Sequence, residues 1–429
     1  MVLFALCFLA TLPAVFSNIK KLATSLQVIV TVLFGIHLVI CAVIGIKTGN
    51  QLSFIVSDIT TFMALALVPG FLATMCNKRS ISRAIDVVFW AAVGLAVIGV
   101  LLHFIDAFTN EYVMMAINNW LNKRSLGGMA LMQTGIHRIY MKSQMFIQVA
   151  IVYGVWKLGK KDVHNKKIII LAEGLLFCGC ILTYTRGFWV GLAASAGLLL
   201  LMGFKYWGGF LKVAGKMLAV FVAFVLISTV CYRGLYVPVE IVNRFDPNLL
   251  VSSDFAENSL NSKGDKDKDK ENNKDKDKNE KNEIDESNIE ARDIRAKTLS
   301  MLKKRIAKHP IIGNGLGENL DSIRDDGKTE YMYLDTTMKT GIVGTMLFVL
   351  TYFGFIAVQI YYSLKRRKMK LPPPEWEDAE VRNRFLTAAY IGIAVTSCFN
   401  PFMNNPMGIT LLMLTATAVF DGKPKNSEV

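Results

Sequence analysis

Apolar blocks close to the length of a membrane span constrain the fold of this chain most. The chain has 429 residues, of which 52% are hydrophobic, and its mean hydropathy is positive at +0.38. An apolar helix of about 20 residues crosses the hydrocarbon core of a bilayer. We therefore predict an all-α polytopic membrane protein with about eleven transmembrane helices, or about twelve if a further helix precedes the first block.

The apolar blocks divide the chain into three regions. We expect an N-terminal bundle of about eight spans over 1–233, an extracytoplasmic loop with short helices over 234–339, and further spans over 340–429. The last region includes a cytoplasmic loop at 363–384 and a cytoplasmic tail. The first block lacks the basic start of a signal peptide, so we interpret it as a span. The predicted spans are 1–17, 24–46, 53–75, 86–108, 143–158, 167–184, 187–203, 213–233, 340–362, 385–399 and 406–420.

Lysine and arginine in the short loops predict the orientation, because these residues are enriched on the cytoplasmic side of membrane proteins. They gather in every second loop, so segments 109–142 and 234–339 are predicted to be extracytoplasmic. The net charge of +14 is dispersed between the spans and forms no single stripe, which argues against a nucleic-acid partner. The basic clusters are Lys20–Lys21, Lys78–Arg83, Lys160–Lys167, Lys205–Lys216 and Lys365–Lys370.

The long loop contains a charged insert at 263–290. Its 8 lysines alternate with 11 aspartates and glutamates, and it has almost no apolar residues. Such a segment cannot fold by burial, so we predict disorder. Calcium binding is the alternative, but the interleaved lysines would repel a cation. Order is predicted to resume at Ile294–Ile306, where leucines recur at helical spacing as in an amphipathic helix on the membrane surface.

A glycine-rich run, His309–Gly317, follows this amphipathic segment. Gly313, Gly315 and Gly317 occupy alternate positions, and each would cost about 1 kcal/mol in a helix interior. We therefore predict a tight turn that brings backbone N–H groups close to an anionic substrate. His309 belongs to this turn.

Arginines on the predicted outer side are candidate ligands for a diphosphate, because a forked guanidinium donates two parallel hydrogen bonds. Arg186 lies in the very short turn between two spans; the alternative is a snorkelling anchor at a span edge. Arg292 and Arg295 precede the glycine run, and Arg138 lies in the first outer segment. The alternative for these arginines is a solvated position on the surface.

Two carboxylates, Glu330 and Asp335, precede the span at 340–362. Either could accept a proton from a sugar hydroxyl, although many such groups are simply solvated. The seven cysteines lie in or beside apolar blocks and are predicted to pack as small hydrophobic residues. The chain contains no nucleotide-binding motif and no zinc spacing, so we predict no cofactor and no metal, and a donor that is already activated.

Three sequence pieces resemble the O-antigen ligase/polymerase family of bacterial membrane glycosyltransferases. The first is Thr185–Gly191, which is similar to the family's arginine at the outer edge of a central span. The second runs from Arg295 through the glycine run, and resembles the family's "R…HPLLGxGxG" pattern. The third is Tyr333–Gly344, which resembles its "HNxYL…GxxG" segment. The resemblance covers about 170–360.

The resemblance implies a function and a set of residue roles. The family transfers a glycan from undecaprenyl diphosphate at the outer face of the bacterial cytoplasmic membrane, without a nucleotide or a required metal. Arg186 and Arg295 would hold the diphosphate, with Arg292, Arg138, the glycines, His309 and Asp335 binding substrate. Glu330 stands where the family has its proposed catalytic histidine, which is a departure from the family pattern. The acceptor would be a glycolipid, a glycan or a protein. The enzyme itself would be in contact with membrane lipids.

Two other functions fit parts of this pattern. A repeat-unit polymerase of the same family would share the donor and differ in the acceptor. A polysaccharide flippase or exporter would place charged residues deep within several spans and show internal repeats. In this sequence only Asp58 and Glu173 lie deep within apolar blocks, and no repeat is evident, so we prefer the ligase.

Overall fold

Helices make up most of the structure, a computed structural model that describes residues 2–74, 78–132, 134–159, 165–202, 207–245, 294, 296–320, 329–367 and 374–421. Among these residues, five helices are long and apolar enough to cross a membrane. They are Leu26–Lys47, Leu52–Thr74, Ser80–Phe108, Ala214–Tyr232 and Met332–Lys365. The predicted polytopic membrane architecture agrees with this finding, while the number of about eleven spans stays a prediction. The insert at 263–290 lies outside the described residues.

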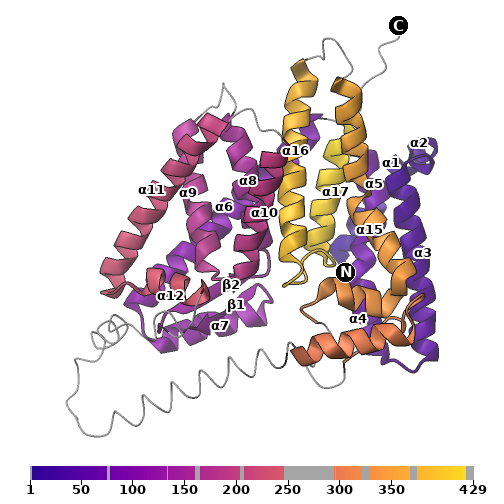
Figure 1. The fold of residues 1–429 in the computed structure, drawn as a ribbon, viewed down its shortest axis with the longest axis horizontal. Coiled ribbons are helices and arrows are strands. Elements are labelled where there is room, and N and C mark those ends of the chain that lie inside the picture. The colour runs from indigo at the N-terminus through magenta and orange to yellow at the C-terminus, as the bar shows by residue number, and fades with distance from the viewer. Residues whose placement is uncertain are drawn as a thin grey trace. The chain divides into compact units, whose positions relative to one another are not determined.

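One compact unit, unit 1, comprises Met1–Val87, Ala194–Leu199 and Asp293–Val429. Helix α15 packs along α3, α1 packs on α5, and α16 pairs with α17 (Figure 1). Residues 296–308 form a further helix. The elements of unit 1 are α1 (Val2–Ser17), α2 (Ile19–Ala23), α3 (Leu26–Lys47), α4 (Leu52–Phe62), η1 (Met63–Leu67), α5 (Val68–Thr74), α15 (Met332–Arg367), α16 (Pro374–Thr396) and α17 (Pro406–Asp421).

The second compact unit, unit 2, comprises Val88–Ala193 and Leu200–Arg292. Its helix α9 packs on both α8 and α11. The boundaries between the units fall inside α6 (Lys78–Phe108) and α10 (Arg186–Leu201). The other elements of unit 2 are α7 (Glu111–Lys123), β1 (Gly127–Leu131), β2 (His137–Met141), α8 (Met145–Gly159), α9 (Lys166–Leu182), α11 (Trp207–Tyr232) and α12 (Tyr236–Phe245).

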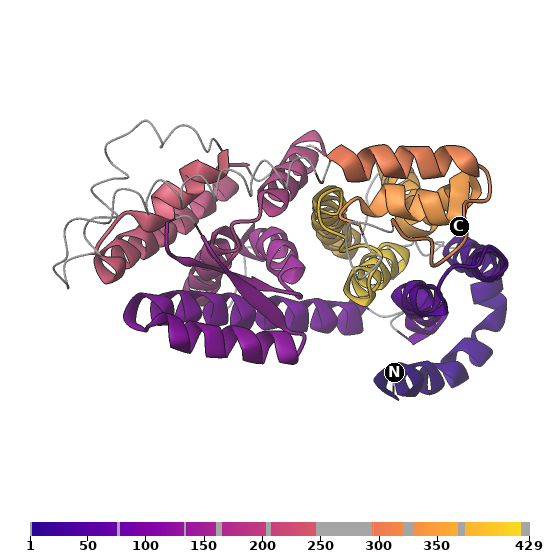
Figure 2. The same cartoon turned by 90° about the horizontal axis from the view of Figure 1, so that it is seen from below.

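A small β-hairpin departs from the predicted all-helical fold. Strands β1 and β2 pair antiparallel, from Gly127 opposite Met141 to Leu131 opposite His137. Met129 and Ile139 of the hairpin are buried in one cluster with Met114 and Leu121 of α7. Figures 1 and 2 show α7 and the hairpin at one end of the unit 2 helices. The apolar face of α7 covers the hairpin, which would be marginal in isolation.

Two predicted spans differ in detail from the helices observed. The block at 53–75 forms α4, a 3₁₀ segment and α5, with Pro69 at the second position of α5. Proline has no N–H and suits the first turn of a helix, so a continuous α-helix is interrupted near this point. The span predicted at 340–362 starts earlier, at Met332, and contains Gly341 with φ 67° and ψ −173°.

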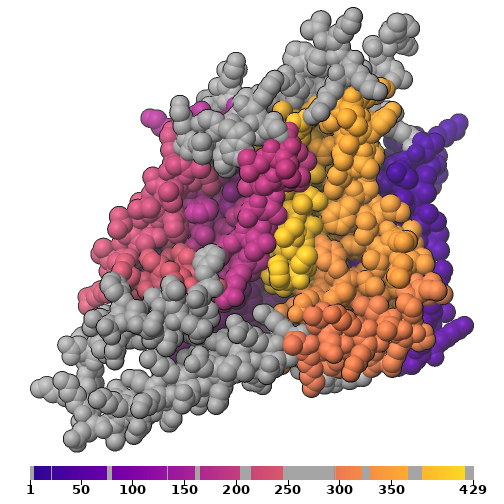
Figure 3. Space-filling model, viewed as in Figure 1, coloured from indigo at the N-terminus to yellow at the C-terminus, as the bar shows by residue number. Residues whose placement is uncertain are grey.

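Large apolar side chains lie on the outside of several long helices. On α11 they include Leu218, Val222, Leu226 and Val230, of which Val230 is 76% exposed. Figure 3 shows part of this surface, in rose, along the edge of unit 2. Contiguous apolar surface of this extent is unfavourable in water and favourable against acyl chains. Inside unit 2, a buried cluster joins Phe224 and Tyr232 of α11 to Leu182 of α9.

Candidate functional site

Arg138 of β2 is bound by the turn between α9 and α10. Its Nε donates to the Thr183 carbonyl oxygen at 2.7 Å, and its Nη2 donates to Thr185 Oγ1 at 2.9 Å. Both threonines are buried, and Tyr184 between them has a left-handed φ of 45°. The forked guanidinium thus ties the hairpin to the turn, and the turn places Arg186 at the start of α10.

Arg244 of α12 lies near Arg138 and carries a carboxylate partner. Its Nε is 3.3 Å from Glu240 Oε1, one helical turn earlier. Thr134 Oγ1 donates to Glu240 Oε2 at 3.2 Å, which connects α12 to the loop between the two strands. Burial above all raises the pKa of Glu240, although the Arg244 charge opposes this.

The guanidinium groups of Arg138, Arg186 and Arg244 lie close enough at this end of unit 2 for their charges to shift pKa values within the group. Burial first, and then the charge of Arg244, lower the pKa of Arg138. The pKa of Arg244 is lowered mainly by burial and further by Arg186, while Glu240 opposes both effects. Arginine nevertheless stays charged in proteins, so mutual repulsion is retained in the fold. Arg186 itself is exposed. We call Arg138, Arg186 and Arg244 the arginine group.

The arginine group is suited to an anion that carries more than one charge. The group has three guanidiniums, and the carboxylate of Glu240 pairs with the guanidinium of Arg244. Partly buried arginines bind phosphate strongly, because they donate two hydrogen bonds and are screened less by water than surface charges are. A diphosphate diester has a negative charge on each phosphoryl group. It therefore matches the charge and the donor geometry of the group.

The glycine run of unit 1 adopts the predicted tight turn, but its N–H groups bond within the protein. Gly313, Gly315 and Gly317 have φ values of 87°, 90° and 79°. The N–H of Gly315 donates to the Lys339 carbonyl oxygen at 3.1 Å, and that of Leu316 donates to the Cys41 carbonyl oxygen at 2.9 Å. A Cβ at Gly315 would overlap the backbone of Gly45 in α3. The turn thus packs closely between α3 and α15.

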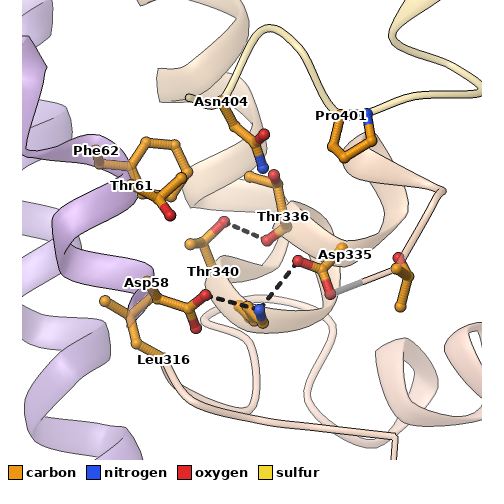
Figure 4. A pocket seen from close by; sticks show the side chains of 11 residues that line it. Asp58, Thr61, Phe62, Leu316, Asp335, Thr336, Thr340, Pro401 and Asn404 are labelled. Atoms are coloured by element: carbon orange, nitrogen blue, oxygen red, sulfur yellow. Dashed lines mark hydrogen bonds and ion pairs between the residues drawn. The ribbon is translucent and has the colours of Figure 1, made fainter. Parts of the chain in front are cut away.

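A buried ion cluster connects this turn to two helices. Lys339 Nζ of α15 lies 2.9 Å from Asp58 Oδ1 of α4 and 3.0 Å from Asp335 Oδ2 (Figure 4). The Gly317 N–H donates to Asp58 Oδ2 at 2.8 Å. The three charged side chains are at most 9% exposed. Asp335, predicted to bind substrate, therefore neutralises a buried lysine in this structure.

A small polar pocket lies beside the ion cluster. It is lined by Asp58, Asp335 and Lys339 together with polar side chains that include Thr336 and Asn404 (Figure 4). Its free volume is about 20 Å³. That volume holds about one water molecule. The pocket thus has room for water beside the ion cluster.

The other predicted site residues lie in unit 1 or outside the described part of the chain. His309 is exposed at the end of the helix formed by 296–308, and Glu330 is half-buried two residues before α15. Arg292 and Arg295 lie outside the described residues. Within the part that the structure describes, no three His, Cys, Asp or Glu side chains gather as a metal site would require.

Sequence reasoning missed Arg244 and Glu240. Both lie in the long loop before the charged insert, on α12. Their spacing of four residues is a signal for an ion pair on one helix face, but this spacing is common on solvated helices. Sequence reasoning included Arg138 and Arg186, which the structure brings close to Arg244.

Comparison with known proteins agrees with the resemblance found in the sequence. A sequence model of the O-antigen ligase family matches residues 171–349, which include Arg186, Arg244 and the glycine run. No curated protein and no solved structure matches the chain. Members of this family are membrane enzymes that transfer lipid-linked glycans. The chain is thus similar to the O-antigen ligase family over residues 171–349.

Proposed function

We propose that this protein is an integral-membrane glycosyltransferase that moves a glycan from undecaprenyl diphosphate to an acceptor outside the cytoplasm. The family match supports glycan transfer, and the long apolar helices support a membrane location. The location proposed is the bacterial cytoplasmic membrane, with the site on the extracytoplasmic side. The observation that carries the proposal is the arginine group, which lies within one compact unit.

The chemistry explains why such a group is needed. The bond between the sugar and the diphosphate is already activated, so transfer requires stabilisation of the charge that develops on the leaving diphosphate. Fixed cationic donors stabilise that charge, and removal of one such donor commonly lowers kcat by about 10²–10³. Arg138 is pre-oriented by two hydrogen bonds, so it needs little reorganisation when the donor binds.

The resemblance assigns further roles that we include in the proposal. Arg292 and Arg295 would contribute to diphosphate binding, and Glu330 would accept the proton of the acceptor hydroxyl. Gly313, Gly315, Gly317 and His309 would shape the substrate surface. The hydrogen bonds of the glycine run within unit 1 suggest that its contribution is to hold that surface in place.

A reconstituted assay tests the role of the arginine group. The purified protein in liposomes would receive a lipid-diphosphate-linked glycan extracted from the source cells. Arg138→Ala and Arg244→Ala should each lower transfer by about 10²–10³. Arg124→Ala is a matched control, because Arg124 is an exposed arginine of the same unit and has no described ion pair. Wild-type transfer in both Arg138→Ala and Arg244→Ala would overturn the proposal.

The product distinguishes the ligase from the polymerase. A ligase places a finished glycan on a different acceptor, whereas a polymerase lengthens the glycan while it stays on undecaprenyl diphosphate. Electrophoresis of glycans from a deletion strain should show free polymer on its carrier if the protein is a ligase. Single capped repeats would instead identify a polymerase. Lipid-linked glycan confined to the cytoplasmic leaflet would identify a flippase.

A further inference from the structure

Helix α7 has apolar side chains on both of its faces, and protein covers one of them. Met114 and Leu121 are buried against the hairpin. On the outer face, Tyr112 is 85% exposed, Met115 is 56% exposed and Trp120 is 55% exposed. A helix that is apolar all round is stable only inside apolar surroundings. The outer face of α7 therefore requires an apolar environment that the described part of the chain does not supply.

The polar residues of α7 leave this outer face continuous. The two charged residues of the helix, Glu111 and Lys123, stand at its ends. Asn118 is used within unit 2, because its Oδ1 accepts a hydrogen bond from the N–H of Met129 in β1 at 2.8 Å. Tryptophan and tyrosine, the aromatic types on the outer face, are enriched where a membrane meets water.

The place of α7 in the chain puts it next to a membrane surface. Helix α6 is long and apolar enough to cross a membrane, and it ends at Phe108. The linker is Thr109 and Asn110, and Asn110 Oδ1 accepts from the Val113 N–H at 3.2 Å as the N-cap of α7. The 13 residues of α7 extend over about 20 Å, too short to cross a hydrocarbon core of about 30 Å. Figures 1 and 2 show α7 at the end of the unit 2 helices, which suits a helix that lies in the plane of the interface.

The same helix supports the strand that carries Arg138. Ile139 of β2 is buried in one cluster with Met114 and Leu121 of α7. Arg138 precedes it in the strand and points the other way, toward the turn before α10. Strand β2 thus lies between α7 and that turn. The depth of α7 relative to the membrane therefore sets the depth of Arg138.

We propose that the outer face of α7 is embedded among the phospholipids of the extracytoplasmic leaflet and so holds Arg138 at the level of the lipid phosphates. The inference rests on the proposed function, in which the arginine group meets the diphosphate of a donor anchored in the same leaflet. That diphosphate is joined directly to the polyprenyl chain, so it stays close to the acyl region. An interfacial helix buries its apolar face about 5–10 Å into the boundary between headgroups and acyl chains. A site attached to such a helix is at the depth where the diphosphate lies.

Quenching of Trp120 fluorescence tests the depth of α7. The full-length protein is reconstituted in vesicles of phosphatidylethanolamine and phosphatidylglycerol with acyl chains brominated either near the headgroup or near the chain end. The signal of Trp120 is the difference between the wild type and Trp120→Phe. Bromine near the headgroup should quench this signal most, and acrylamide in the water should quench it little. Quenching by acrylamide without quenching by either bromolipid would overturn the proposal and leave the face to a protein partner.

A charge at Trp120 tests whether α7 positions Arg138. Trp120→Glu puts a carboxylate into the interface, so the KM for the lipid-linked donor should rise and kcat/KM should fall by up to about 10²-fold. Trp120→Tyr is the matched control, because it keeps an interfacial aromatic ring and should keep the wild-type KM. Trp120 is exposed, so both variants should unfold at the wild-type temperature. A wild-type KM in Trp120→Glu would overturn the positioning role.

Two other outcomes are separable from these. Conversion of a wild-type dimer to a monomer by Trp120→Glu in detergent would assign the face to a second copy of the chain and overturn the lipid contact. Absence of transfer by the wild type would refute the proposed function. The quenching measurement does not depend on transfer, so it decides the depth of α7 in either case.

Discussion

Lys339 Nζ of α15 lies 2.9 Å from Asp58 Oδ1 of α4, although the two residues are 281 positions apart in the sequence. Asp335 holds the same ammonium from the other side at 3.0 Å. Removing one member of a buried ion cluster leaves the remaining charges uncompensated, which costs about 3–5 kcal/mol. Lys339→Met should therefore lower the free energy of unfolding by about this amount. Denaturant unfolding in detergent measures the change.

The control for this prediction is Lys47→Met, because Lys47 is exposed at the end of α3. It should change stability by at most about 0.5 kcal/mol. Equal stability of Lys339→Met and Lys47→Met would show that the cluster is not a stabilising part of unit 1.

Gly315→Ala should destabilise unit 1. Gly315 has φ 90°, and a new Cβ would meet the backbone of Gly45, which cannot move aside cheaply. Backbone strain of this kind costs about 1–3 kcal/mol before the overlap is counted. Gly35→Ala is the control, since that helical position has open space around it and should gain up to about 1 kcal/mol. The midpoints of thermal unfolding should shift in opposite directions, and a shared direction would contradict the turn geometry.

Glu240 should make stability fall as the pH rises. Burial raises the pKa of its carboxyl in the folded state above the value in the unfolded chain. The folded state then holds the proton over the interval between the two pKa values, and unfolding releases it. Raising the pH from the ordinary glutamate range therefore reduces the contribution of Glu240 to the unfolding free energy. Wild-type protein should lose stability relative to Glu240→Gln across that interval, and a relative gain would mean that Arg244 outweighs burial.

Thr185→Val should loosen the turn that positions Arg138. The substitution keeps the shape of the side chain and removes the oxygen that accepts from Arg138 Nη2 at 2.9 Å. A partly buried donor left without its acceptor costs about 1–3 kcal/mol. The free energy of chemical unfolding should therefore fall, and the KM for the donor should rise. Thr109→Val, at an exposed position after α6, is the control and should alter neither property.

The arginine group illustrates how far a sequence can locate a site. Arg186 stands out because a charge in a very short turn between two apolar helices cannot be far from the bundle. Arg138 stands out less, and its contacts with Thr183 and Thr185 depend on a hairpin that the apolar pattern did not predict. Arg244 looks like an ordinary helical ion-pair residue until the fold brings α12 beside β2.

For the glycine run, the backbone conformation could be predicted from the sequence, but its hydrogen-bond partners could not. Its left-handed backbone could be predicted, because only glycine adopts positive φ without a steric penalty at three alternate positions. The destination of its N–H groups could not be predicted. They bond to Cys41, Asp58 and Lys339, and these residues belong to helices that are distant in sequence.

The amino-acid sequence by itself determined the membrane-length helices, the tight glycine turn and the O-antigen ligase resemblance, because these depend on local hydrophobicity, local sterics and short motifs. Only the tertiary structure decided which charges meet: Lys339 with Asp58, His137 with Asp106, and Arg244 with Arg138. The physical reason is that a contact between distant residues is set by how helices pack, and packing depends on the whole set of side chains at once.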